Sequence, residues 1–458
     1  MPDRRDDDLD SWLDGRIEPL PPPPGTFELI KKRARRRKYR RLAVGAGAAA
    51  VVVAAAVAVP QIVNLTVVNP ATATGVAANG RPAVRAPSAS SGANAASSSA
   101  LPLPSSVAAP VPANFRPSSV TFIGTHTGWV IGQAGTPGHC ATPYCTSVAR
   151  TDDAGKTWTG VPAPLTGPAD GATGVSQIRF LDREDGWAFG PQLYATHDGG
   201  QIWTQVATHG LRVTDLETVG ARAFALFASC TGTGAAFATQ CTSYTLYSSP
   251  ASSSSDSWAP VGAATSGLAG TAASLVLTGT SGYLLAPSGM LYSGPVNGSA
   301  PWQQVKQIPC PVGQPLADGQ PTGALLAAAN ATNLVLTCAS SSAAGTQQAK
   351  QVFTSADGGI VWRNAGTAPA LGLTTSATAS PDGTYVLATG QGIDVRPTGS
   401  ATWQAATLDR PAPAGGFGYV GMTTDAQGIA LPADPAVGTV WFTFDGGQSW
   451  APSAVSGP

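Results

Sequence analysis

Charged side chains are scarce in this 458-residue chain, in which Asp, Glu, Lys and Arg together make up 11% of the residues. The formal net charge at pH 7 is zero, but the charges are unevenly distributed. Residues 1–41 carry 12 Lys and Arg and 8 Asp and Glu, whereas the remainder carries 14 and 18. Because nucleic-acid binding needs a basic surface, the negative surplus beyond residue 41 argues against nucleic acid as a partner of the folded part.

Residues that commonly carry enzyme chemistry are also few. The chain has four His residues at scattered positions, and only two Glu residues follow position 41, Glu184 and Glu217. The sequence contains no Gly-x-Ser-x-Gly nucleophile elbow, Gly-rich phosphate loop, His-x-x-x-His pair or calcium loop. We therefore predict no catalytic residues, no cofactor and no metal site.

What the sequence does contain is a regular series of Trp residues. Seven of them are separated by 45, 55, 44, 60, 41 and 47 residues. A period in the forties, with β-type sequence between the marks, is typical of a β-propeller with one blade per repeat. We therefore predict an all-β, seven-bladed propeller, or a six-bladed one if the degenerate middle repeats merge. The residues are Trp158, Trp203, Trp258, Trp302, Trp362, Trp403 and Trp450.

Four of these Trp residues end a sharper motif, Ser/Thr-x-Asp-x-Gly-x-x-Trp, in segments 151–158, 196–203, 355–362 and 443–450. The spacing suits a hairpin turn, because the Asp carboxylate can accept hydrogen bonds from N–H groups of its own turn. The Gly can adopt a positive φ, and the Trp offers an apolar face for packing between blades. We expect a structural role for Asp153, Gly155, Trp158, Asp198, Gly200, Trp203, Asp357, Gly359, Trp362, Asp445, Gly447 and Trp450.

The motif resembles the Asp-box, or BNR repeat, of sialidase-like propellers. A second mark, Phe followed seven residues later by the Trp of a Gly-Trp pair, occurs at 122–129 and 180–187. Together the marks resemble the blades of the non-catalytic propellers of the photosystem II assembly and stability factor type. The resemblance covers about 119–454, and it implies a binding platform for other proteins. Those relatives are described with an Arg patch on the binding face; this sequence shows no matching patch, so the photosystem partner does not carry over.

Catalytic sialidases resemble one another in an Arg triad, an Arg-Ile-Pro motif, a Tyr nucleophile with a Glu partner, and an Asp acid/base. No Arg-Ile-Pro occurs here, and segment 178–180 is the nearest look-alike. Glu184 lies in a polar turn, and Glu217 has Tyr244 or Tyr247 as possible partners. Glycoside hydrolysis needs two carboxylates facing one bond, and most Asp residues here belong to motifs or turns. We predict that the protein is not an enzyme, with a divergent glycoside hydrolase as an alternative.

The repeat marks also place the individual blades within a propeller spanning 118–455. The first and last repeats must meet, because closing the ring leaves only short, protected strand edges. The predicted blades cover 119–163, 174–209, 212–262, 272–308, 323–368, 374–408 and 417–454.

The preceding part of the chain has a different character. Residues 1–41 form a tail that ends in a basic run, and 42–68 contains no charged residue and has the length of a transmembrane helix. Basic residues directly before the span place the N-terminus in the cytoplasm and the propeller outside. Residues 69–117, rich in Ala, Ser and Pro, are expected to be a flexible linker. A signal peptide cleaved at 56–58 is the alternative, and either way the propeller is exported.

The tail contains one short amphipathic pattern within 6–17. Its apolar residues fall on one helical face and are surrounded by Asp residues. A short acidic peptide of this kind can fold on contact with a cytoplasmic protein, although an unstructured tail with chance periodicity is the alternative. The apolar residues are Leu9, Trp12, Leu13 and Ile17.

All six cysteines lie beyond the predicted membrane span. An even number on the exported side favours disulfides, and six cysteines allow 15 connectivities. Propeller topology favours local pairs, with a metal site beside His139 as an alternative for the first of them. The favoured pairs are Cys140–Cys145, Cys230–Cys241 and Cys310–Cys338.

These expectations combine into a single-pass plasma-membrane protein with a cytoplasmic N-terminus and an extracytoplasmic propeller. The propeller would bind an envelope or extracellular protein, or a glycan, without catalysis, since propellers present loops around a shallow funnel. Transmembrane signalling, with residues 6–17 holding a cytoplasmic regulator, is a second hypothesis. A divergent, sialidase-like glycoside hydrolase is the third.

Overall fold

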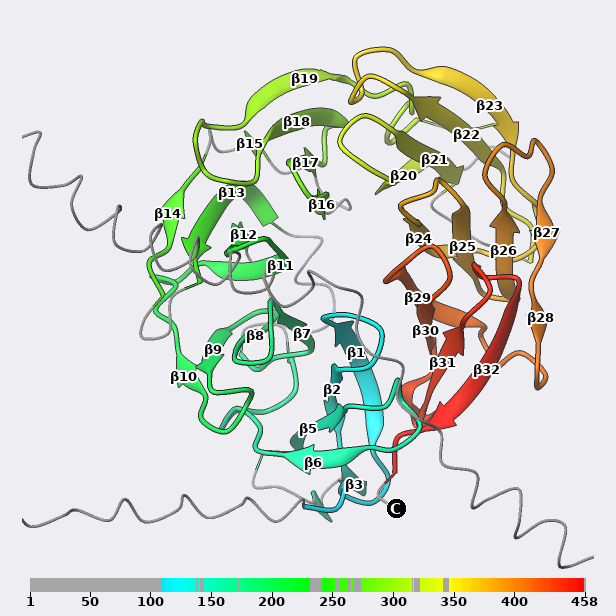
Figure 1. The fold of residues 1–458 in the computed structure, drawn as a ribbon. Coiled ribbons are helices and arrows are strands. Elements are labelled where there is room, and N and C mark those ends of the chain that lie inside the picture. Colours follow the sequence, from blue (N-terminus) through cyan, green and yellow to red (C-terminus); the bar gives the residue numbers. More distant parts are fainter. Residues whose placement is uncertain are drawn as a thin grey trace, which may run out of the picture. The chain divides into compact units, whose positions relative to one another are not determined.

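A computed structural model describes residues 109–136, 139–140, 144–170, 173–230, 241–251, 256–261, 265–266, 273–314, 316, 322–340 and 346–456. Within these residues the chain forms seven sheets of four or five strands arranged around a ring (Figure 1). Each sheet is built from strands of one continuous stretch of the chain, so that each is one blade; in the first blade a separate hairpin lies between the second and third strands. The predicted seven-bladed β-propeller is confirmed, and the six-bladed alternative is wrong.

The first four blades follow one another along the chain. Blade 1 contains β1 (Arg116–Phe122), β2 (Gly128–Gln133), β5 (Thr146–Thr151) and β6 (Thr159–Val161), with a small hairpin of β3 (Gly135–Thr136) and β4 (His139–Cys140). Blade 2 contains β7 (Gln177–Phe180), β8 (Asp185–Phe189), β9 (Leu193–His197) and β10 (Thr204–Gln205). Blade 3 contains β11 (Arg212–Val219), β12 (Arg222–Cys230), β13 (Cys241–Pro250), β14 (Ala259–Pro260) and β15 (Thr265–Ser266). Blade 4 contains β16 (Ser274–Leu277), β17 (Ser281–Leu285), β18 (Met290–Pro295) and β19 (Gln303–Gln307).

Three more blades complete the ring, and the main strands of all seven blades begin and end within four residues of the predicted ranges. Blade 5 contains β20 (Thr322–Ala328), β21 (Leu334–Ser340), β22 (Lys350–Ser355) and β23 (Arg363–Thr367). Blade 6 contains β24 (Thr374–Ala379), β25 (Tyr385–Thr389), β26 (Gly392–Arg396) and β27 (Gln404–Ala405). Blade 7 contains β29 (Phe417–Met422), β30 (Gly428–Pro432), β31 (Thr439–Thr443) and β32 (Ser449–Ala454), a 3-10 turn η2 (Pro435–Val437), and β28 (Thr407–Leu408), which pairs in parallel with β32.

The seven periodic Trp residues each occupy a different interface between neighbouring blades. Each lies at the start of the outermost main strand of its blade, as Trp158 does before β6. Its indole packs into the cluster shared with the preceding blade; Trp302, for example, packs with Phe224 and Leu226 of blade 3. Trp158, Trp203, Trp258, Trp302, Trp362, Trp403 and Trp450 therefore lie in seven separate clusters around the ring.

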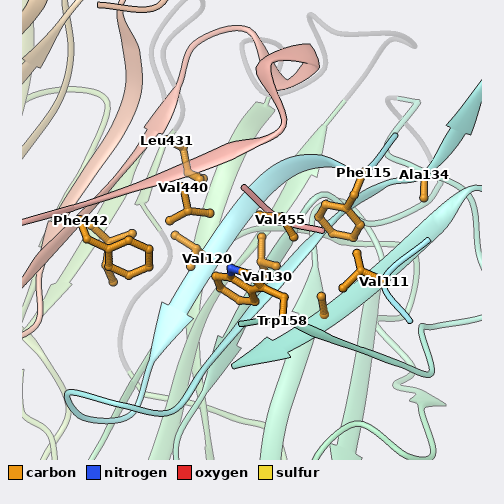
Figure 2. Close-up of a cluster of buried hydrophobic side chains, with 12 residues drawn as sticks. Val111, Phe115, Val120, Val130, Ala134, Trp158, Leu431, Val440, Phe442 and Val455 are labelled. Carbon is orange, nitrogen blue, oxygen red and sulfur yellow. The ribbon is translucent and has the colours of Figure 1, made fainter. Parts of the chain in front are cut away.

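Blades 1 and 7 close the ring through a shared apolar core. Val120 and Val130 of blade 1 pack with Val440 and Phe442 of blade 7, and Trp158 lies in the same cluster (Figure 2). The four main strands of blade 1 all come from the first repeat, and the C-terminal strand β32 stays in blade 7. Closure therefore depends on side-chain packing rather than on a strand exchanged between the two ends of the chain.

Two hydrogen bonds cross this closure, which we call the seam. The Ser453 hydroxyl in β32 donates to the carbonyl of Gly155 in blade 1. The Gln427 side-chain amide donates to the Thr125 carbonyl at 3.0 Å. Polar and apolar contacts thus act together where the first and last repeats meet.

The folded part begins earlier than the predicted end of the linker at residue 117. Ala109 forms an antiparallel bridge with Gly160 beside β6, and Val111 and Phe115 are buried in the seam cluster. These residues pack at the junction of blades 1 and 7 because burial there removes their apolar side chains from water.

The three disulfides join the local pairs that the sequence favoured. Cys140–Cys145 closes a loop of blade 1, and Cys230–Cys241 links β12 to β13. Cys310–Cys338 ties the segment after β19 to β21 and so connects blades 4 and 5. Because Cys140 is bonded to Cys145, the alternative of a metal site at His139 does not hold.

The predicted tail, the span 42–68 and the partner-binding residues 6–17 lie outside the described residues. Among the described residues no helix has the length and apolar character that crossing a membrane requires.

Candidate binding site in the central channel

The first strands of the blades surround the centre of the ring (Figure 1), and hydroxyl groups join them. Ser119 follows a bulge in β1, and its Oγ accepts a hydrogen bond from the Ile178 N–H at 3.3 Å. Ser376 follows a bulge in β24, and its Oγ accepts from the Val420 N–H at 3.3 Å. In both places a neutral hydroxyl satisfies a backbone donor of the next blade.

Strand β11 carries an acid at the corresponding position. Asp215 follows the bulge in β11, and its Oδ2 accepts a hydrogen bond from the Leu275 N–H at 2.8 Å. Glu217 lies two residues further along, on the same face of the strand. Two residues after Ser119 and Ser376 lie Thr121 in β1 and Thr378 in β24. Strand β11 therefore has two carboxylates at the positions where those strands have hydroxyls.

Arg179 of β7 pairs with the second of these carboxylates. Its Nε donates to Glu217 Oε1 at 3.0 Å, and its Nη1 donates to Ser119 Oγ at 3.2 Å and to the Ile178 carbonyl at 2.8 Å. The Arg179 side chain is 12% exposed and that of Glu217 is 30% exposed. The guanidinium is therefore fixed against Glu217, while Asp215 relies on backbone N–H donors.

The surroundings shift the pKa values of this charged cluster. Burial, followed by the negative charge of Glu217, raises the pKa of Asp215 to about 7, although the Leu275 N–H and Arg179 oppose the change. Burial disfavours the charge on Arg179, but Glu217, Tyr419 and Asp215 outweigh it and raise the pKa of the guanidinium. Burial also raises the pKa of Tyr419, which lies within reach of all three charges. Burial and the charge of Glu217 thus favour the neutral form of Asp215.

A cavity of about 720 Å³ opens beside this cluster. Glu217 and Tyr419 form part of its wall, together with residues of β16, β20, β24 and β29. It extends to the turns that follow these first strands, at 278–280, 329–331 and Pro381. The volume suits a small ligand or a side chain of a partner protein. We call this cavity with Arg179, Asp215, Glu217 and Tyr419 the channel site.

The four motif turns lie elsewhere, just before the outermost main strands, and share one hydrogen-bond pattern. The Asp Oδ1 accepts the N–H four residues later at 2.9 Å, and the Ser or Thr hydroxyl donates to the same carboxylate. That hydroxyl also accepts the Gly N–H at 2.9 Å. The glycines adopt φ values of 81°, 94°, 92° and 89°, which side chains disfavour. They are Gly155, Gly200, Gly359 and Gly447.

In these bonds the motif carboxylates accept hydrogen bonds from N–H groups of their own turns. Burial is the largest single influence and opposes the change, but the hydrogen bonds together lower the pKa of Asp153 and Asp445 below the usual value. At the exposed Asp357 the Val361 N–H is the main cause of a lowered pKa. Carboxylates held ionised in this way act as turn-forming acceptors, not as proton donors.

Glu217 has a different partner from those that the sequence suggested. Tyr244 is buried in the core between blades 3 and 4, and Tyr247 packs against Phe227 at a ring-centroid distance of 4.5 Å. Both belong to β13, whereas Glu217 faces the channel and Arg179.

Asp215 was missed in the sequence. The available signal was the pair of acids two residues apart in the first strand of a blade, in a region with few other charges. Among the described residues, no group of three or more His, Cys, Asp and Glu side chains gathers closely enough to hold a metal ion.

Comparison with known proteins adds likenesses of fold. No family model and no curated protein matches the chain. YCF48 bound to D1 peptide is 16% identical, with a TM-score of 0.46, over 74% of this chain and 96% of that one. YCF48 from Cyanidioschyzon merolae is 14% identical, with a TM-score of 0.40, over 60% and 83%. The GH74 xyloglucanase from Xanthomonas campestris is 13% identical, with a TM-score of 0.26, over 73% and 72%. These values are too low to transfer a ligand, a partner or an activity.

Proposed function

We propose that this protein is a membrane-anchored, extracytoplasmic binding platform that recognises an envelope or extracellular protein, or a glycan, without catalysis. The observation that carries the proposal is the channel site, where a cavity of about 720 Å³ adjoins a half-buried cluster of charges. Large cavities with a few converging polar groups are the usual places of ligand binding. Membrane anchoring through 42–68 rests on the sequence, and the three disulfides agree with export.

The test is proximity crosslinking in intact cells, comparing the full-length chain with a version that lacks residues 1–30. We expect both chains to capture the same envelope protein or glycan. A platform would be ruled out if neither chain enriched any envelope component over a membrane-anchored control domain.

The same comparison tests transmembrane signalling, for which residues 6–17 supply the argument. That function predicts a cytoplasmic protein captured by the full-length chain alone. If deletion of residues 1–30 leaves both the captured proteins and the cellular phenotype unchanged, the tail has no signalling role.

Glycoside hydrolysis is a second candidate for the channel site, and one observation favours it. Glu217 lies in the wall of the cavity and Asp215 lies two residues before it in the same strand, and the raised pKa of Asp215 is a property of catalytic acids. Hydrolysis predicts turnover of a glycoside that disappears in Asp215→Asn. A broad panel of glycosides without turnover, at pH 5 to 8, would remove this candidate.

A further inference from the structure

We propose that the channel site receives a cationic side chain, lysine or arginine, of a protein partner, and that Asp215 and Glu217 pair with its charge. The inference rests on the proposed binding function and specifies the chemistry of the ligand at that site.

Strand β11 does not need carboxylates to hold the ring together. In β1, Ser119 and Thr121 accept the N–H groups of Ile178 and Phe180 at 3.3 and 3.4 Å. In β24, Ser376 and Thr378 accept those of Val420 and Met422 at 3.3 and 3.4 Å. Hydroxyls thus perform, twice, the structural task that Asp215 performs towards Leu275.

Carboxylates at these positions have a cost that hydroxyls avoid. Removing a charge from water is unfavourable unless a partner compensates it. Two adjacent acids also repel each other, and Glu217 contributes to the raised pKa of Asp215. Two carboxylates that weaken local stability, at positions where hydroxyls perform the same structural task in β1 and β24, point to a functional role.

The acids of the cluster outnumber the guanidinium that donates hydrogen bonds to it. Arg179 gives its Nε to Glu217 and its Nη1 to Ser119 and a carbonyl, so that one guanidinium faces two acids. A cationic ligand in the cavity would lie beside Glu217 and would add a second positive charge to the cluster.

The lining of the cavity combines a carboxylate with apolar side chains. Glu217 presents a charged group at the wall, while Leu275, Leu326, Ala328 and Met422 supply apolar surface. Lysine and arginine pack their alkyl stems on apolar surface and direct their charged heads to polar partners. The site therefore matches both parts of such a side chain.

Saturation-transfer NMR on the full-length chain tests the proposal with small probes. The probes are Nα-acetyl-lysine methylamide, Nα-acetyl-arginine methylamide, the neutral Nα,Nε-diacetyl-lysine methylamide, and cadaverine. We expect binding of the first two at least about tenfold tighter than that of the neutral probe, since loss of a charge pair at a half-buried site is worth about 1.4 kcal/mol or more. Equal binding of charged and neutral probes, or no binding of any probe, would overturn the inference.

Two variants locate the binding. Asp215→Ser copies the residue of β1 and β24, so it keeps an acceptor for Leu275 and is expected to fold with an unchanged or higher Tm. It should weaken the blocked lysine at least about tenfold, whereas Glu184→Gln, at an exposed turn, should not. Unchanged affinity in Asp215→Ser would contradict the assignment.

The outcomes also separate this inference from the proposed function. If cadaverine binds much more tightly than the blocked amino acids, the site takes a free diamine, and the inference of a protein side chain fails. If an envelope protein is captured equally by the wild-type chain and Asp215→Ser, the platform stands and the cationic contact fails.

Discussion

At the scale of single residues, the propeller relies on side chains that take the place of backbone partners at turns and between blades. Thr443 shows the principle, because its hydroxyl accepts the Gly447 N–H at 2.9 Å and donates to Asp445 at 2.8 Å. Lys350, by contrast, is a buried cation, only 2% exposed, that donates hydrogen bonds to backbone carbonyls. Each residue can be tested by a substitution that keeps its shape and removes its polar group.

Replacing Thr443 by Val should destabilise the protein by about 1–3 kcal/mol, because the Gly447 N–H is left unsatisfied. Thr443 is 1% exposed, so water cannot replace the lost acceptor. Urea unfolding of the full-length chain measures the change, with Thr407→Val at an exposed site as the control. A Thr443→Val variant as stable as the control would show that the hydroxyl is dispensable.

Lys350 predicts a dependence of stability on alkaline pH. Its ammonium donates to the carbonyls of Pro369 and Leu371 at 2.6 and 3.0 Å. Burial lowers the pKa of Lys350 to about 8, against the opposing charge of Asp394. Between this pKa and that of the unfolded chain, unfolding takes up a proton, so the free energy of unfolding should increase as the pH rises.

We expect an increase of roughly 1–2 kcal/mol between pH 8 and 10.5, allowing for partial screening by water. The measurement is urea unfolding across this range for the wild-type chain and for Lys350→Met. The free energy of unfolding should increase with pH more in the wild-type chain than in Lys350→Met, by the amount given above. The same pH dependence in both chains would show that Lys350 has an ordinary pKa.

At the scale of elements, stability lies at the interfaces between blades, and the seam is the interface without sequential continuity. Phe442 of β31 packs against Phe122 of β1 with ring centroids 5.7 Å apart, in an edge-to-face arrangement. No main strand is exchanged across the seam within the described part of the chain. Apolar side chains such as Phe442 must therefore hold the first and last blades together.

Truncating Phe442 to Ala should cost about 3–5 kcal/mol, the range for a buried Phe. Phe442 is 5% exposed, whereas Phe444, stacked on it at 6.2 Å, is 60% exposed and provides a matched control. Phe444→Ala should cost less than about 1 kcal/mol. Equal effects of the two substitutions in urea unfolding would contradict a closure based on buried packing.

At the scale of the whole molecule, the sequence predicted the number of blades because each periodic Trp fills one interface. The spacing of the Trp residues therefore predicts the number of interfaces between blades. This holds even for blades 3, 4 and 6, which lack the complete turn motif. The turn chemistry was also predictable, since the Asp and its acceptor bonds lie within a few residues of each other.

The channel site could not be predicted in the same way. Arg179 and Glu217 come from different blades, and a bulge before Asp215 decides which side chains of β11 face the channel. Bulges change the register without a distinct sequence signal. The sequence therefore suggested tyrosines of β13 as partners of Glu217, instead of the guanidinium across the blade boundary.

The most direct test of the account places a photo-crosslinking residue at Thr280, an exposed position at the channel mouth, in intact cells. The matched position is Gln404, which is exposed on the outermost main strand of blade 6. The account predicts one partner captured from position 280 and not from 404, with capture strongly reduced by Asp215→Ser. Capture from position 404 alone would contradict a binding platform centred on the channel site. Capture from 280 that is unaffected by Asp215→Ser would leave the platform standing and would contradict the contact at Asp215.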